Sequence, residues 1–362
     1  MSDFFEKIEL HKKQELPFVM YRKPNSDQIF ALLQQSKILF EATDFTEKGF
    51  VFSSFDTCKT VLIPENESEI LNTSSVKVVE FESSNDIKKV TDTTAKAQFE
   101  LMVQSGITAI KKGDFKKVVL SRVEEIALDG FDFVETFKNL LNLYPSAFVY
   151  SFYHPEVGFW MGASPEQLLK SKNNIFETTS LAGTQKDKGD VSAITWQQKE
   201  KDEQQYVTDY ILKKLKNVAS KIDVSEPYSL KAGSIWHIKT DISGELHNDS
   251  NLKQVIDLLH PTPAVCGLPK KKAMTFIVEN ENYNRSFYTG FLGELNSNRN
   301  SNESISDLFV NLRCMQIIND KVNLYMGCGI TAESVPEKEW KESVNKSMIM
   351  KKALCYLFKE VK

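Results

Sequence analysis

The sequence is short of the features that mark several large classes of protein. Its five cysteines are odd in number and form no C-x-x-C pair, so neither a disulfide framework nor a cysteine zinc site is indicated. No apolar run approaches the roughly 20 residues of a membrane-spanning helix, and the opening MSDFFEKIELHKKQEL contains no apolar signal segment. The net charge of −4 gives no general electrostatic reason to bind nucleic acid or an anionic membrane. These absences predict a cytoplasmic protein without nucleic-acid or membrane partners.

Several catalytic signatures are also missing. The chain contains no H-E-x-x-H, no Walker A sequence and no zinc-ligand spacing. Ser164 is not a nucleophile elbow, because Pro165 follows it and no glycine stands at position 166. Zinc-protease, P-loop and serine-hydrolase chemistry are therefore not indicated.

What remains is an ordinary globular composition in a chain of 362 residues, 41% hydrophobic and 26% charged. Periodicity and turn residues predict helices over 98–112, 131–143, 199–222 and 336–359. They predict strands within 18–63, 116–127, 146–153 and 286–330, with a hairpin turn at Ile318-Asn-Asp-Lys321. A polar surface connection with one strand-like piece is expected over 64–96. The elements do not alternate as βαβ, which favours an α+β fold with largely antiparallel sheets.

The stretch LYMGCGITA, residues 324–332, has the spacing of a dinucleotide-binding glycine loop. That interpretation fails, because Ser334-Val335-Pro336 separates the glycines from the helix and no acidic residue follows about 20 positions later. From spacing alone, Gly327 and Gly329 are expected at a bulge or bend that needs positive φ.

Two helix starts carry carboxylates three residues apart: Glu200 with Glu203, and Glu339 with Glu342. Each pair lies on one helical face. Solvated acids that favour the helix dipole are one interpretation, and spacing alone favours it. A shared site for a hard divalent cation such as Mg²⁺ is the other.

Four further residues could carry chemistry. Lys117 opens the apolar run KVVLSRV, and a lysine that points inward there could act as a base. Glu166 follows a Ser-Pro turn that could place its carboxyl in a cleft, although a helix start is the commoner setting. His237 and His260 could each be ordinary buried histidines.

Together these segments resemble the chorismate-utilising enzymes, and most closely the isochorismate synthases. The resemblance covers about residues 98–358 and rests on nine motifs in order: FKKVVLSR (115–122), GASPEQLL (162–169), SLAGTQ (180–185), KEKDEQQYVTDY (199–210), HIKTDISGEL (237–246), HPTPAVCGLP (260–269), FYTGFLGEL (287–295), NLRCMQI (311–317) and GCGITAESVPEKEWKES (327–343). It implies one large domain over residues 1–362, with an antiparallel β-sandwich core flanked by helices, as in anthranilate and aminodeoxychorismate synthases. Residues 1–97 would be the variable part and 98–358 the catalytic part.

The resemblance also implies the substrate chorismate, a Mg²⁺ requirement and a set of roles. Lys117 resembles the base that activates water, and Glu166 the acid that faces it. Glu203 and Glu342 resemble direct Mg²⁺ ligands, with Glu200 and Glu339 acting through water. The remaining motif positions resemble substrate contacts: His237, Ala264, Tyr288, Arg313, Gly327, Gly329 and Lys346.

Three positions indicate which family chemistry to expect. Lys117 stands where ammonia-using anthranilate synthases typically carry a non-basic residue. Ala182 replaces the lysine that forms a covalent intermediate in aminodeoxychorismate synthases. Ala264 is typical of isochorismate synthases, whereas salicylate synthases often carry threonine there. The expected reaction is isomerisation of chorismate to isochorismate, with salicylate synthase as the alternative and an amidotransferase-partnered synthase component less favoured. The resemblance leaves the menaquinone and siderophore types as alternatives. It implies an enzyme that acts without an amidotransferase subunit.

Overall fold

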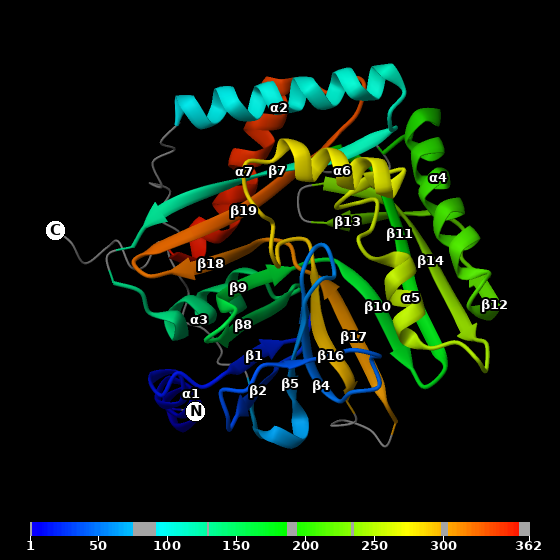
Figure 1. Ribbon diagram of the computed structural model, residues 1–362. Coiled ribbons are helices and arrows are strands. Elements are labelled where there is room, and N and C mark those ends of the chain that lie inside the picture. Colours follow the sequence, from blue (N-terminus) through cyan, green and yellow to red (C-terminus); the bar gives the residue numbers. More distant parts are fainter. Residues whose placement is uncertain are drawn as a thin grey trace.

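The computed structural model describes residues 2–74, 92–128, 130–186, 194–232, 235–297 and 303–354. Within these ranges the chain forms two large sheets, packed face to face and flanked by helices (Figure 1). Every strand pairing recorded there is antiparallel, and the expected α+β sandwich is confirmed. None of the helices in the described ranges is long and apolar enough to cross a membrane.

The first sheet holds the strand that begins with Lys117. In spatial order its strands are β15 (Gly267–Leu268), β7 (Lys117–Ala127), β19 (Lys321–Ile330), β18 (Cys314–Ile318), β9 (Gly158–Ser164), β8 (Phe148–His154), β1 (Phe18–Arg22), β2 (Gln28–Gln34) and β6 (Ser68–Ser74). The predicted hairpin is confirmed, because β18 and β19 pair with Ile318 opposite Lys321.

The second sheet holds the strand that follows Glu166. Its strands are β12 (Ala219–Val224), β14 (Ile235–Leu246), β11 (Ile175–Lys186), β10 (Gln167–Lys172), β17 (Ile305–Val310), β16 (Phe291–Ser297), β4 (Gly49–Ser53), β5 (Thr60–Pro64) and β3 (Phe40–Glu41), with β13 (Tyr228–Ala232) also paired to β14. Strands from residues 18–74 thus enter both sheets, so the N-terminal quarter is part of the sandwich.

Helices cover the outer faces of both sheets (Figure 1). They are α1 (Ser2–Lys13), α2 (Thr93–Lys112), α3 (Phe133–Leu143), α4 (Gln198–Leu215), α5 (Leu252–Leu259), α6 (Lys270–Asn280) and α7 (Pro336–Leu354), with a 3₁₀ turn η1 (Glu65–Glu67). Local chemistry explains the bounds of α2. The side chain of Asp92 accepts hydrogen bonds from the first free amides, and Gly113 ends the helix at φ 85°.

Aromatic side chains fill the space between the sheets. Phe148 of the first sheet stacks on Phe309 of the second, with ring centroids 4.4 Å apart. Phe52 and Trp160 meet across the same layer at 5.9 Å, edge to face. Separate apolar clusters lie under the helices, one of them beneath α4 and α5. Rigid packing on both faces holds the strand ends that carry the polar residues.

Some boundaries differ from the sequence prediction. The helix expected over 199–222 ends at Leu215, because the chain from Ala219 forms the strand β12 on the edge of the second sheet. The first long helix starts at Thr93 rather than at residue 98. Glu166 precedes a strand and not a helix. The strand expected within 76–82 and the helix end at 359 lie outside the described residues.

Candidate active site

Lys117 stands at the beginning of β7, where the backbone lies between β15 and β19. Its ammonium is 3.2 Å from Oε1 of Glu203 on α4, and its side chain is 20% exposed. The ion pair therefore joins the first sheet to a helix that covers the second.

The two glycines of β19 do not form the expected bend. Gly327 and Gly329 sit in uninterrupted register opposite Ser121 and Val119, and neither has φ in the left-handed region. The prediction of positive φ was wrong because the glycines are needed for space. A Cβ on Gly329 would lie 3.3 Å from Lys117 Cε, and one on Gly327 would lie 3.0 Å from the hydroxyl of Tyr288.

Tyr288 lies against Gly327, and Arg313 stands just before the start of the neighbouring strand β18. Tyr288 is buried and stacks on Tyr325 of β19, with ring centroids 5.4 Å apart. Arg313 immediately precedes β18 in the left-handed region, at φ 47°. Burial lowers the pKa of Arg313, and the carboxyl of Glu166 acts in the opposite direction. A non-glycine residue held at positive φ indicates a position fixed by its surroundings.

Glu166 lies in the short connection between β9 and β10. Its backbone is fixed, because Val310 N donates a hydrogen bond to its carbonyl oxygen at 2.9 Å. Burial raises the pKa of its carboxyl to about 7, although Lys117 and Arg313 both lower it. A carboxyl with a pKa near neutrality can donate a proton at physiological pH.

His237 lies in the same electrostatic field. Its Nδ1 is 2.9 Å from the carbonyl oxygen of Gly183. Burial lowers its pKa, and the positive charges of Lys346, Lys117 and Arg313 lower it further. The structure thus brings three cationic side chains from distant parts of the sequence close enough to act on His237.

The start of α4 holds the first carboxylate pair. Glu200 accepts a hydrogen bond from Gln197 N at 2.7 Å and another from Gln185 Nε2 at 3.2 Å. It therefore caps the helix, as an acidic residue in a first turn commonly does. Glu203 lies one turn later, so of this pair only Glu200 stands at the helix start as predicted.

The second pair lies on α7, with Glu339 in its first turn and Glu342 beyond it. One oxygen each from Glu339 and Glu342 and the sulfur of Cys328 all lie within 4.8 Å of one another. Lys346 is 2.8 Å from Glu342 Oε1 and donates to the carbonyl oxygen of Gly327 at 2.8 Å. Burial raises the pKa of Glu339, and the negative charge of Glu342 acts in the same direction.

These donors fit a hard divalent cation. Two carboxylates converge on one spot, as Mg²⁺ prefers, while the thiol is a softer and poorer donor for it. Among the described residues, Glu203 does not belong to this group and pairs with Lys117 instead. The geometry therefore gathers half of the predicted ligand set.

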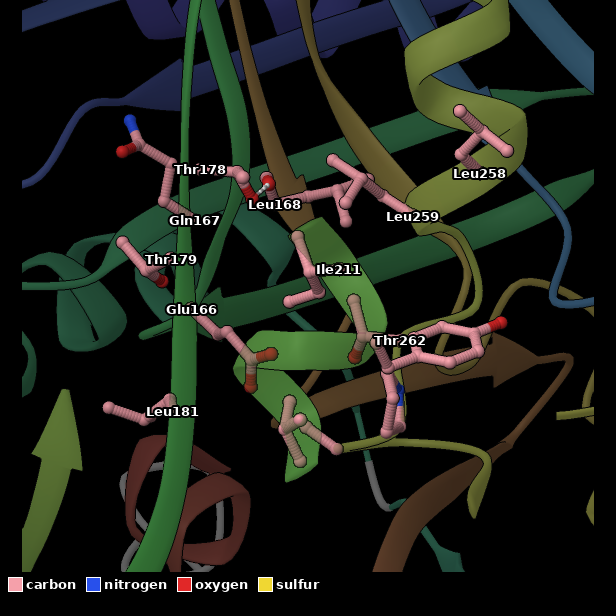
Figure 2. Close-up of a pocket in the computed structure, with 14 residues that line it drawn as sticks. Glu166, Gln167, Leu168, Thr178, Thr179, Leu181, Ile211, Leu258, Leu259 and Thr262 are labelled. Carbon is pink, nitrogen blue, oxygen red and sulfur yellow. Dashed lines mark hydrogen bonds between the residues drawn. The ribbon is translucent and has the colours of Figure 1, made fainter. Parts of the chain in front are cut away.

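A small cavity borders Glu166 (Figure 2). Ala264 lies on its wall, together with apolar residues from β10, β11, α4 and α5, including Leu168, Leu181, Ile211 and Leu259. Sequence reasoning missed Thr262 on this wall, although it stands two residues before Ala264 in the same motif. His260 is buried, its pKa is lowered to about 4 by burial, and its Nε2 is 3.1 Å from the carbonyl oxygen of Phe55, so it matches the ordinary buried histidine.

Comparison with known proteins gives a consistent result. The family model described as chorismate binding enzyme matches residues 50–355. The isochorismate synthase EntC of Escherichia coli K12 is 30% identical over 256 residues, which are 68% of this chain and 64% of EntC. Anthranilate synthase component 1 of Aquifex aeolicus is also 30% identical, over 292 residues, with 78% of this chain and 57% of that protein covered. The matches thus span about three fifths of the length of these relatives.

Among solved structures, the menaquinone-specific isochorismate synthase MenF of Escherichia coli superposes with a TM-score of 0.78. The alignment covers 95% of this chain and 90% of MenF at 22% identity. At that identity the likeness shows a shared fold.

Proposed function

The chain belongs to the chorismate-binding enzymes, and on that premise we propose that it is a Mg²⁺-dependent isochorismate synthase. The observation that carries this proposal is that the charge of Lys117 acts on the buried carboxyl of Glu166. The pKa of Glu166 is raised by burial to about 7, in the field of the ammonium of Lys117. A reaction that adds water and expels hydroxide needs both an acid and a base.

The proposed reaction moves one hydroxyl group around the chorismate ring. Lys117 must first release its own proton and its contact with Glu203. Water then adds to C2 and gives a proton to the neutral amine of Lys117, while Glu166 gives a proton to the hydroxyl that leaves C4 as water. Both ring double bonds shift as the new C–O bond forms at C2 and the old one breaks at C4, so substrate and product are isomers. Glu166 serves as an acid because burial keeps a protonated fraction near neutral pH.

The substrate's carboxylates account for the remaining residues. We assign one carboxylate to Arg313, whose planar donors suit that group. Tyr288 lies against Gly327, and the two glycines leave room for a ligand where a Cβ would intrude. We also assign His237 and Lys346 to the lining of the site, because the charge of Lys346 acts on His237. Ala264 lies on the wall of the cavity that borders Glu166.

Glu203 and Glu342 would hold Mg²⁺ directly, with Glu200 and Glu339 acting through water. When bound, the ion would neutralise a carboxylate of the substrate. Glu339 and Glu342 already converge, whereas Glu203 would have to leave its ion pair with Lys117. We also propose that residues 1–362 act as one domain, because strands from the N-terminal quarter pair into both sheets.

The experiment is to incubate purified protein with chorismate and Mg²⁺, without ammonia or any added protein. Isochorismate as the product supports the proposal and indicates that no amidotransferase subunit is needed. Salicylate appearing without an added lyase identifies a salicylate synthase instead. No turnover with water, but formation of an aminated product when ammonia is added, contradicts the proposal.

A further inference from the structure

Thr262 carries a buried hydroxyl that the proposed chemistry has not used. Its Oγ1 is inaccessible to solvent and has no hydrogen-bond partner in the described part of the chain. Its backbone is fixed, because its carbonyl oxygen accepts from the amides of Val265 and Cys266 at 3.1 and 3.0 Å. A buried hydroxyl without a partner costs free energy, so such groups normally bond to protein, water or ligand.

The surroundings of this hydroxyl are mainly apolar. Thr262 and Glu166 line the same cavity, and both side chains are directed into it (Figure 2). Two other polar groups on the wall are engaged elsewhere: Thr178 Oγ1 donates to Leu168 O at 2.7 Å, and Gln167 Nε2 donates to Asp307 at 2.6 Å. Thr262 therefore offers a fixed, uncommitted hydroxyl to whatever occupies the cavity beside Glu166.

The size of the cavity selects the occupant. It leaves about 20 Å³ for the centre of a water molecule. One water occupies roughly 10–15 Å³ and needs at least two polar partners, so the cavity has room for water. Thr262 Oγ1 and the carboxyl of Glu166 supply two partners of the right kind, and an additional organic ligand has no room.

We propose that Thr262 is a positioning residue that holds one water molecule against the carboxyl of Glu166. The hydroxyl of Thr262 donates to the water, and the water donates to the ionised carboxylate. A donor to the charged form lowers the pKa of a carboxyl, in opposition to burial. Thr262 thus tunes the pH at which Glu166 can serve as the acid, an inference that rests on the proposed function for its kinetic consequence.

Other charges face Glu166 and must stay constant in a test. Lys117 at the start of β7 and Arg313 before β18 both act on it. Tyr210 of α4 lines the cavity. The substitution Thr262→Val removes only the hydroxyl and keeps the branched shape, so these groups stay in place.

The test compares the pH dependence of kcat/KM for the unaltered protein, Thr262→Val, Thr262→Ser and Thr179→Val. Thr179 lines the same cavity and is a matched control. Activity requires protonated Glu166, so it falls as pH rises through the pKa of that group. In Thr262→Val the carboxylate loses one donor, so the pH at which kcat/KM declines should rise by about one pH unit. The shift should be much smaller in Thr262→Ser and Thr179→Val.

Two results would overturn the inference. One is a profile of Thr262→Val that superimposes on that of the unaltered protein. The other is a raised KM with the pKa unmoved, which assigns the hydroxyl to direct contact with substrate. A high-resolution crystal structure of the resting protein supplies a readout independent of activity. A water that bonds both Thr262 and Glu166, and is lost in Thr262→Val, supports the inference even if the protein makes no isochorismate. A dry cavity in the unaltered protein refutes it, whatever the reaction.

Discussion

Replacing Glu166 by glutamine changes the stability of the protein in a way that depends on pH. Glutamine has nearly the shape of a protonated glutamate but cannot ionise. Burial raises the pKa of Glu166 from 4.5 to about 7. At about 1.4 kcal/mol per pH unit, this rise corresponds to about 3 kcal/mol between the protonated and the fully ionised protein.

The sign follows from comparing the folded and unfolded chains. Below pH 4.5 the carboxyl is protonated in both, and its burial carries no charge penalty. Between pH 4.5 and 7 the unfolded chain releases the proton and the folded chain retains it, so the free energy of unfolding falls. Above pH 7 the penalty is complete. The free energy of unfolding of Glu166→Gln should therefore exceed that of the unaltered protein by about 2–3 kcal/mol at pH 8 and by less than about 1 kcal/mol at pH 5.

Urea denaturation followed by tryptophan fluorescence at the two pH values measures this difference. Glu6→Gln is the control, because Glu6 is exposed on α1 and undergoes the same chemical change. Its stability should follow that of the unaltered protein at both pH values. A stability difference for Glu166→Gln that is equal at pH 5 and pH 8 would refute the argument that burial holds the proton on this carboxyl.

Three further predictions concern the site. Lys117→Ala should lower kcat for isochorismate formation by about 10² to 10⁴-fold with an unchanged circular dichroism spectrum, and full activity would remove Lys117 as the base. Gly327→Ala places a Cβ 3.0 Å from the hydroxyl of Tyr288; differential scanning fluorimetry should show a lower Tm, equivalent to about 1–3 kcal/mol, and KM should rise. Glu342→Ala should weaken Mg²⁺ binding in calorimetry by more than the 10–100-fold typical of an outer-shell change, and an unaltered Kd would exclude it as a ligand.

Much of the fold was predictable because its signals are local. The spacing of apolar residues predicted α2, α3, α4 and α7, and the Asn319-Asp320 turn predicted the hairpin of β18 and β19. The end of α4 could not be predicted in this way. The residues after Leu215 are compatible with a helix by their local pattern. They form a strand because residues 219–224 pair with β14 in the second sheet.

In the candidate site, too, some features had local sequence signals and others depended on tertiary structure. Residue types and motif order identified Lys117, Glu166 and Arg313, and the family match supports the chorismate-binding assignment. Spacing suggested a bend at Gly327 and Gly329, whereas the structure shows regular strand with side chains of the site packed against both glycines. Thr262 carries no local signal of function, since a threonine between two prolines is an ordinary turn residue.

The sequence by itself determined the chemical groups, the two helices that carry the carboxylates, and the runs of strand-forming residues that build a sandwich. These properties depend on residues within one or two turns of each other. Only the tertiary structure decided that Glu166 is buried enough to retain a proton near neutral pH, and that Lys117 faces Glu203, 86 positions away. Proton affinity depends on burial and on charges brought from distant segments, so it is set only when the two sheets and their helices have packed together.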